Sequence, residues 1–159
     1  MLIAVISDSH GNRISIDKVK KRISSADVLL FLGDGEGDLR EITEEFKGEV
    51  YAVRGNCDMR GLYPEERLIE LQGKKIFMCH GHRYGVKYGY NSIFYRGKEV
   101  GADIVLFGHS HIPIIEEEDG LILMNPGSIS LGMGRLDKTL GYIDLIEGKH
   151  NQDAFMNDK

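Results

Sequence analysis

Seven Asp, Asn and His side chains come directly after short apolar segments, and their donor atoms are of the kind that bind transition metals. The seven residues are Asp8, His10, Asp34, Asn56, His80, His109 and His111. Carboxylate and amide oxygens combined with neutral imidazole nitrogens suit Mn²⁺, Fe²⁺, Co²⁺, Ni²⁺ or Zn²⁺. One ion does not need so many ligands, whereas two ions about 3.5–4 Å apart would use them all. The residue types therefore predict a centre for two divalent transition-metal ions.

Such a centre would carry net positive charge. Asp8 and Asp34 contribute two negative charges against four positive charges from two divalent ions. An anionic phosphate would be attracted to this site. The ions would also lower the pKa of bound water enough to supply hydroxide near neutral pH.

The distribution of histidines supports a shared site. Taken alone, the pair His109 and His111 is as typical of a solvated loop as of a functional site. However, five of the six histidines follow apolar segments, and only His150 does not. The five are His10, His80, His82, His109 and His111. Because ligands bind beyond the carboxyl ends of strands in open α/β sheets, we expect these side chains to converge.

The elements that must position these residues are short strands and amphipathic helices. Apolar runs at residues 2–6, 28–33, 50–55, 75–79, 103–108 and 121–124 are typical of strands covered on both faces. Periodic segments at residues 14–23, 39–46 and 91–100 predict helices. Gln72-Gly73 and Asp119-Gly120 predict hairpin turns. We expect an α/β fold with a partly parallel and partly antiparallel sheet.

The bulk composition excludes several classes of protein. With 159 residues the chain has the size of one compact domain. No apolar run reaches the length that spans a bilayer, and the first ten residues lack the features of a secretory signal. Cys57 and Cys79 form no C-x-x-C motif and fit reduced thiols, so we expect a cytoplasmic protein with no membrane association. The net charge of −5 and the scattered basic residues argue against binding of long nucleic acid.

Taken together, the motifs resemble the calcineurin-like metallophosphoesterase superfamily. They are D-x-H at Asp8–His10, GD at Gly33–Asp34, GN at Gly55–Asn56, H-G-H at His80–His82 and GH-x-H at Gly108–His111. GNCD at Gly55–Asp58 and NPGS at Asn125–Ser128 look like the small YfcE-type phosphodiesterases. The resemblance implies an αββα sandwich of two mixed β-sheets flanked by helices. It also implies one metallophosphoesterase domain over residues 1–159 with no cap domain.

The resemblance further implies an activity and a division of the ligands. One ion is assigned Asp8, His10 and His111, the other Asn56, His80 and His109, with Asp34 bridging them. The implied enzyme is a metal-dependent phosphodiesterase in which a metal-bound hydroxide attacks phosphorus, with Mn²⁺ the first expectation. Its implied substrate is a small phosphodiester or nucleotide-like molecule, and a homo-oligomer is left open.

Six further residues are candidate substrate contacts: Asn12, Cys57, Asp58, His82, Asn125 and Ser128. For Asn12 and the NPGS loop, ordinary turn chemistry is the alternative. His82 is equally compatible with a role in supporting His80 or with solvation. Cys57 stands where many members of the superfamily have a histidine that assists the leaving group, and packing is its alternative. Because a neutral thiol with a pKa of about 8.5 is a poor general acid, we expect aryl diesters to be cut faster than alkyl diesters.

Two rival functions remain open. One is a phosphomonoesterase, against which the missing histidine at residue 57 argues mildly. The other is a non-catalytic scaffold like Vps29, which has the same fold and works by protein contact; the tyrosine-rich segment after His82 would then be a candidate contact surface. A competent ligand at every expected position favours the enzyme.

Overall fold

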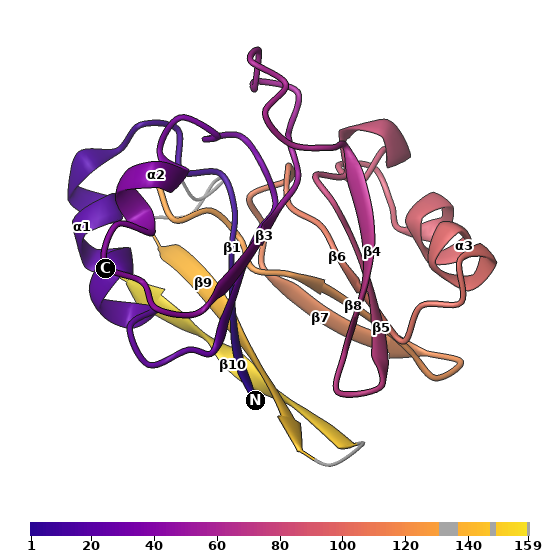
Figure 1. The fold of residues 1–159 in the computed structure, drawn as a ribbon. Helices are drawn as coiled ribbons and strands as arrows, with labels where there is room; N and C mark the ends of the chain where they lie inside the picture. Colours follow the sequence, from indigo (N-terminus) through magenta and orange to yellow (C-terminus); the bar gives the residue numbers. More distant parts are fainter. Residues whose placement is uncertain (131–136, 147–148, 159) are drawn as a thin grey trace.

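Two five-stranded sheets lie face to face in the computed structural model, which describes residues 1–130, 137–146 and, for the backbone, 149–158 (Figure 1). In order across the first sheet, the strands are β10 (Lys149–Asp158), β9 (Lys138–Ile146), β1 (Leu2–Ile6), β2 (Val28–Phe31) and β3 (Glu49–Ala52). The second contains β4 (Glu66–Leu71), β5 (Lys74–Cys79), β6 (Ile104–Leu106), β8 (Leu121–Asn125) and β7 (Ile114–Glu118).

Both sheets are mixed, as the sequence predicted. Strands β1, β2 and β3 run parallel, and so do β5, β6 and β8. The hairpins β4–β5 and β7–β8 are antiparallel, and β9 pairs antiparallel with β1. The predicted turns are present, with Gln72 and Asp119 at φ of 52° and 51° before a glycine. The backbone at residues 149–158 adds a last strand to the first sheet.

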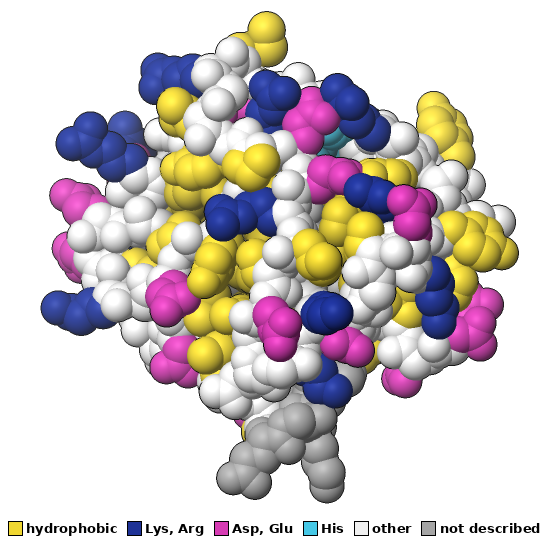
Figure 2. Space-filling model, turned by 45° about the vertical axis from the view of Figure 1, so that its right-hand side comes forward, with side chains coloured by type: hydrophobic (Ala, Val, Ile, Leu, Met, Phe, Trp, Pro, Cys, Tyr) yellow, Lys and Arg dark blue, Asp and Glu magenta, His cyan; other side chains and the backbone are white. Residues whose placement is uncertain are grey.

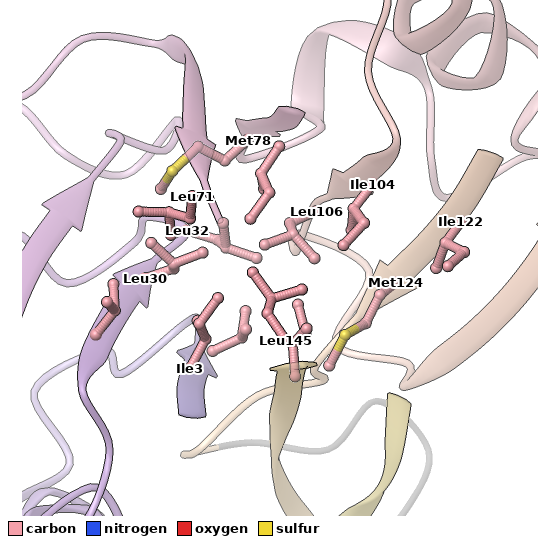
Figure 3. Close-up of a cluster of buried hydrophobic side chains, with 14 of the residues drawn as sticks. Ile3, Leu30, Leu32, Leu71, Met78, Ile104, Leu106, Ile122, Met124 and Leu145 are labelled. Carbon is pink, nitrogen blue, oxygen red and sulfur yellow. The ribbon is translucent and has the colours of Figure 1, made fainter. Parts of the chain in front are cut away.

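A hydrophobic core fills the space between the sheets (Figure 3). The first sheet contributes Ile3, Leu30, Leu32 and Leu145, and the second contributes Met78, Leu106 and Met124. All of these side chains are at most 1% exposed. Burying each one fully contributes about 1.5–3 kcal/mol, so apolar packing between the sheets is a major source of stability.

Helices cover the outer faces of the sandwich. Helix α1 (Arg13–Arg22) buries Ile16 and Val19 on the first sheet, next to α2 (Leu39–Ile42). On the second sheet, α3 (Asn91–Glu99) packs Ile93 and Phe94 against the strands, after a short 3-10 helix, η1 (His82–Tyr84). The predicted αββα sandwich is therefore confirmed. No helix in the described part of the chain is long and apolar enough to cross a membrane.

Helix α2 is shorter than expected. The pattern predicted a helix through residue 46, but α2 ends at Ile42. The Thr43 hydroxyl donates a hydrogen bond to the Leu39 carbonyl at 2.8 Å, and its backbone N–H bonds the same carbonyl. Beyond Thr43, the backbone N–H groups of Glu44 and Phe46 bond carbonyls only three residues back, so the chain continues as turns and not as an α-helix.

Candidate active site

Five of the predicted metal ligands share a strained backbone conformation. Positive φ angles occur at Asp8 (59°), His10 (44°), Asp34 (61°), His109 (67°) and His111 (62°). Within the described ranges, the only other non-glycine residues of this kind are the two hairpin residues Gln72 and Asp119. Such a conformation costs on the order of 1–3 kcal/mol per residue and persists where the surroundings enforce it, commonly at functional sites. The strained residues of the site therefore lie in the loops that follow β1, β2 and β6.

The buried carboxylate of Asp8 is the meeting point of three histidines. Its Oδ1 lies 3.1 Å from His111 Nε2, 3.4 Å from His10 Nε2 and 3.8 Å from His80 Nε2. The other oxygen, Oδ2, accepts a hydrogen bond from the Ser7 hydroxyl at 2.5 Å and the backbone N–H of His109 at 3.3 Å. With Oδ2 held in this way, Oδ1 is directed at the imidazoles.

His80 is oriented by the backbone of the opposite sheet. Its Nδ1 lies 2.8 Å from the Leu32 carbonyl, which accepts a hydrogen bond from the ring N–H. This leaves Nε2 facing Asp34 Oδ2 at 3.1 Å and His109 Nδ1 at 3.2 Å. A carbonyl partner on the far nitrogen is the usual way to fix the tautomer of a metal-binding histidine.

Three groups of donor atoms have the spacing of metal ligands, with all atoms of a group within 4.8 Å of one another. They are Asp8 with His10 and His111, Asp34 with His80 and His109, and His10 with Asp34 and Cys57. The first two match the predicted division of ligands, apart from Asn56. Since imidazole nitrogens and buried carboxylates suit transition metals, these residues fit divalent ions.

The ionisation of these groups in the ion-free protein also fits metal binding. Burial would raise the pKa of Asp8, but hydrogen bonds with His10 and His111 lower it far below its ordinary value. The bond to Asp8 raises the pKa of His10. Burial and the nearby His80 lower the pKa of His109 to about 4, which keeps this imidazole neutral at neutral pH. Asp8 thus stays ionised and His109 stays neutral, which are the protonation states in which carboxylates and imidazoles bind metal ions.

Two glycines of the motifs, Gly55 and Gly108, lie too close to neighbouring side chains to carry a side chain of their own. A Cβ on Gly108 would lie 2.1 Å from the Ser7 hydroxyl oxygen, and one on Gly55 would lie 2.1 Å from Asp34 Oδ1. Both contacts are far inside van der Waals distance. The glycine before His109 and the glycine before Asn56 therefore make room for Asp8 and Asp34.

Asp58, a predicted substrate contact, binds backbone groups of two loops. It is 8% exposed, and its two carboxylate oxygens accept backbone N–H groups from four residues at 2.8–2.9 Å. The donors are Asp34, Gly35, Glu36 and Gly55. Because its oxygens are used by the backbone, Asp58 positions the loops after β2 and β3.

The NPGS loop also serves the backbone. Asn125 is fully buried, and its side-chain amide donates to the Gly108 carbonyl and accepts from the Gly127 N–H. Ser128, also fully buried, donates to the Asp8 carbonyl at 2.8 Å. Asn125 and Ser128 therefore show the turn chemistry that was the alternative to substrate contact, and a contact with substrate stays a prediction for both. Asn12 likewise caps α1, with its side-chain oxygen accepting from the Ser15 N–H at 3.1 Å.

The remaining candidates lie around the two ligand groups. Cys57 is exposed, and its backbone N–H donates to Asp34 Oδ1 at 2.9 Å. The exposed side chain of Asn56 contacts Cys57 Sγ at 3.7 Å, and its predicted role as a ligand beside His80 and His109 stays a prediction. The ring of His82 lies 5.6 Å from that of His80, between centroids. In the view of Figure 2, little histidine surface is visible, beside acidic and basic side chains.

Sequence reasoning missed several residues that hold these loops. The Asp38 carboxylate accepts the Ser9 hydroxyl at 2.6 Å and the Gly11 N–H at 2.8 Å, joining the loop after β1 to the start of α2. Ser130 donates to the Asp8 carbonyl at 2.7 Å. Their partners are mostly backbone groups, which any residue type supplies, so the sequence carries no signal for them.

Two sheets with helices outside, and carboxylates and imidazoles gathered at the strand ends, define an αββα protein with a candidate metal centre. The model of the calcineurin-like phosphoesterase superfamily domain matches residues 1–147. The chain therefore belongs to the calcineurin-like phosphoesterase superfamily, a family of metal-dependent phosphoesterases.

Curated relatives agree with this assignment. The chain is 37% identical over 147 residues to the probable metallophosphoesterase YsnB of Bacillus subtilis, covering 91% of this chain and 85% of that protein. It is 25% identical over 168 residues to the phosphodiesterase YfcE of Escherichia coli, covering 91% and 88%.

Solved structures share the fold. A conserved Streptococcus pneumoniae protein described as a predicted phosphoesterase has a TM-score of 0.81 at 30% identity, covering 98% of this chain and 88% of that one. Vps29 of Entamoeba histolytica, in a crystal with Zn²⁺, has a TM-score of 0.75 at 20% identity, covering 99% of both chains. The second likeness is one of fold alone.

Proposed function

We propose that this protein is a phosphodiesterase that uses two divalent metal ions, held by the two ligand groups around Asp8 and Asp34. The observation that carries the proposal is the contact between the groups: Asp34 Oδ2 lies 3.1 Å from His80 Nε2 and 3.8 Å from His10 Nε2. A carboxylate placed between imidazoles of both groups is suited to bridge two ions. When bound, the ions would neutralise the charge of a phosphate and supply hydroxide near neutral pH.

The protein's own side chains would set the geometry of the reaction. The candidate ligands His10 and Asp34 line a cavity of about 340 Å³, together with Cys57. A phosphate bound there would lie beside the metal ligands while its ester groups extend into the rest of the cavity. Space for more than one ester group supports a diester substrate.

Cys57 bears on the choice of substrate. Partial desolvation and the nearby Asp34 raise the pKa of the Cys57 thiol, so this side chain keeps its proton at neutral pH and is a weak donor to a leaving group. We therefore expect diesters with aryl leaving groups to react faster than alkyl diesters. The relative YfcE, named a phosphodiesterase, supports the diester over the monoester.

The test compares bis(p-nitrophenyl) phosphate with p-nitrophenyl phosphate. The protein is stripped of metal by a chelator and then given Mn²⁺, Ni²⁺, Co²⁺, Fe²⁺, Zn²⁺ or Mg²⁺ separately. We expect ion-dependent hydrolysis with a preference for the diester. Asp34→Asn should abolish turnover, while Asp17→Asn, an exposed aspartate on α1, should leave it unchanged.

Other outcomes would overturn the proposal in different ways. A preference for the monoester would make the protein a phosphomonoesterase. Folded protein that is inactive with every ion would favour a protein-interaction scaffold of the Vps29 kind. Full activity in Asp34→Asn would remove Asp34 from the reaction.

A further inference from the structure

A second cavity adjoins the candidate active site. It has a volume of about 570 Å³ and lies between α2 and the segment at residues 60–63. In Figure 1 this segment belongs to the connection between β3 and β4 that projects at the top of the molecule. Glu36, Gly37 and Arg60 line both this cavity and the one that contains His10 and Asp34. The two cavities are therefore neighbours that share a wall.

The lining of the second cavity combines apolar and cationic groups. Leu39, Val50, Leu62 and Tyr63 supply apolar surface, and Arg40 and Arg60 supply positive charge. Val50 and Leu62 are 37% and 57% exposed, so part of this apolar surface faces solvent. Among the described residues, no carboxylate forms an ion pair with Arg40 or Arg60. Apolar surface beside unpaired guanidinium groups complements an organic group attached to an anion.

The wall between the cavities is fixed to the metal-ligand loop. The carboxylate of Glu36, 6% exposed, accepts the backbone N–H of Arg60 at 2.6 Å and that of Leu62 at 3.2 Å. The backbone N–H of Glu36 in turn donates to Asp58, which also binds the N–H of Asp34. The second cavity is thus held at a defined position relative to Asp34, and a preformed site of this kind reduces the entropy lost on binding.

The size of the cavity narrows the class of ligand. Sites for organic ligands have volumes of about 300–1,000 Å³, and this cavity lies within that range. A methyl or ethyl ester would leave most of the space unfilled. A nucleoside has a flat base for contact with Leu62 and Tyr63 and carries its phosphate at one end.

We propose that this cavity receives the nucleoside of a nucleotide diester whose phosphate lies at the candidate metal centre, with Arg60 at the junction facing the phosphate. The inference rests on the proposed phosphodiesterase function and deepens it by naming the substrate class. It makes Leu62 and Tyr63 specificity residues that act on substrate binding.

The test uses two diesters with the same leaving group. Thymidine 5′-(p-nitrophenyl phosphate) and methyl p-nitrophenyl phosphate both release p-nitrophenolate and both carry one negative charge, but they differ in the second ester group. We expect the KM for the thymidine ester to be lower by about tenfold or more, with a similar kcat. A tenfold change in affinity corresponds to about 1.4 kcal/mol, which a few good contacts can supply. Equal KM values would overturn the subsite and leave the phosphodiesterase function intact.

A matched pair of variants locates the effect. Leu62→Trp fills the cavity and should reduce the ratio of kcat/KM for the thymidine ester to that for the methyl ester by about tenfold, a loss of about 1.4 kcal/mol in selectivity. Leu68→Trp changes a leucine of similar exposure on β4, outside the cavity, and should leave the ratio at the wild-type value. An equal fall of the ratio in both variants would overturn the proposal.

A binding measurement separates failure of the subsite from failure of the activity. If neither ester is hydrolysed, the proposed phosphodiesterase function fails. The cavity is then tested separately, by measuring binding of thymidine 5′-monophosphate with saturation-transfer NMR. Transfer to the thymine protons in the wild-type protein and its loss in Leu62→Trp would support a nucleoside site. The absence of transfer, or transfer that persists in Leu62→Trp, would overturn it.

Discussion

Asp58 holds Asp34 in place through the backbone: its Oδ2 accepts the N–H of Asp34 at 2.8 Å and the N–H of Gly55 at the same distance. One buried carboxylate thus joins the loop after β2 to the loop after β3. The side chain of Asp34 is held separately, by the N–H of Cys57. Asp34 therefore has its backbone and its carboxylate fixed from the same neighbouring loop.

Asp58→Asn should destabilise the protein. An amide keeps one acceptor oxygen but turns a donor toward backbone N–H groups, which leaves buried donors without partners. Because each such group costs about 1–3 kcal/mol, we expect the free energy of unfolding to fall by about 2–5 kcal/mol in urea denaturation. Asp17→Asn serves as the control, and a variant as stable as the wild type would show that Asp58 is dispensable for these loops.

Gly55→Ala should weaken metal binding. The added methyl would lie 2.1 Å from Asp34 Oδ1, so the carboxylate must move. Displacing a ligand or its support typically costs about 10–100-fold in metal affinity, which isothermal titration calorimetry would measure. Gly89→Ala, where nothing lies within 4 Å of the added atom, is the matched control. Unchanged affinity in Gly55→Ala would exclude Asp34 as a ligand.

The two cysteines should differ in reactivity, and metal should change only one of them. Cys57 is exposed and Cys79 is buried, so alkylation of the native protein should modify Cys57 alone. Because Cys57 Sγ lies within 4.8 Å of the donor atoms of His10 and Asp34, a bound divalent ion should slow this reaction. Mass spectrometry would follow the labelling, with Cys57→Ser as the control. An alkylation rate that no ion alters would place the ions away from Cys57.

Tyr84 should ionise late in an alkaline titration. Burial and a hydrogen bond from its hydroxyl to the Glu66 carboxylate raise the pKa of Tyr84 from its ordinary value of 10.0 to about 12. A raised folded-state pKa contributes stability that is complete below pH 10 and is lost as the pH rises through about 12.

Two measurements check this shift. The difference in phenolate absorbance between the wild type and Tyr84→Phe should show one group titrating near pH 12. Between pH 10 and 12, the wild type should lose more stability than the variant. A difference spectrum centred at pH 10 would contradict the assigned hydrogen bond.

The strand ends of the site could be predicted because their sequences combine two strong local signals. Short runs such as residues 104–107, wholly apolar and followed by Gly108, indicate a buried strand and its end. The edge strand β4 was indicated only by the hairpin turn predicted at Gln72-Gly73, because Glu66–Leu71 mixes charged and apolar residues and leaves Leu68 48% exposed. Strand β9 was missed, since its sequence, Lys138–Ile146, includes a buried Gly141 and lacks a continuous apolar run.

The sequence could not predict which polar residues face the ligand and which face the backbone. Asp58, Asn125 and Ser128 belong to motifs of the site, yet their oxygens and nitrogens bind main-chain groups of distant loops. Glu36 and Asp38 do the same without belonging to any motif. These partners depend on the packing of loops from both sheets, which the pattern along the chain does not contain.

The two sheets contribute opposite halves of the candidate metal centre, and this has a mechanical consequence. Asp8, His10 and Asp34 follow strands of the first sheet, whereas His80, His109 and His111 follow strands of the second. Ions bound by ligands from both halves would cross-link the two sheets at one edge of the sandwich. In a single-molecule pulling experiment that shears the layers apart, rupture should need more force with metal than without it, and the first event should break the site before either sheet unravels.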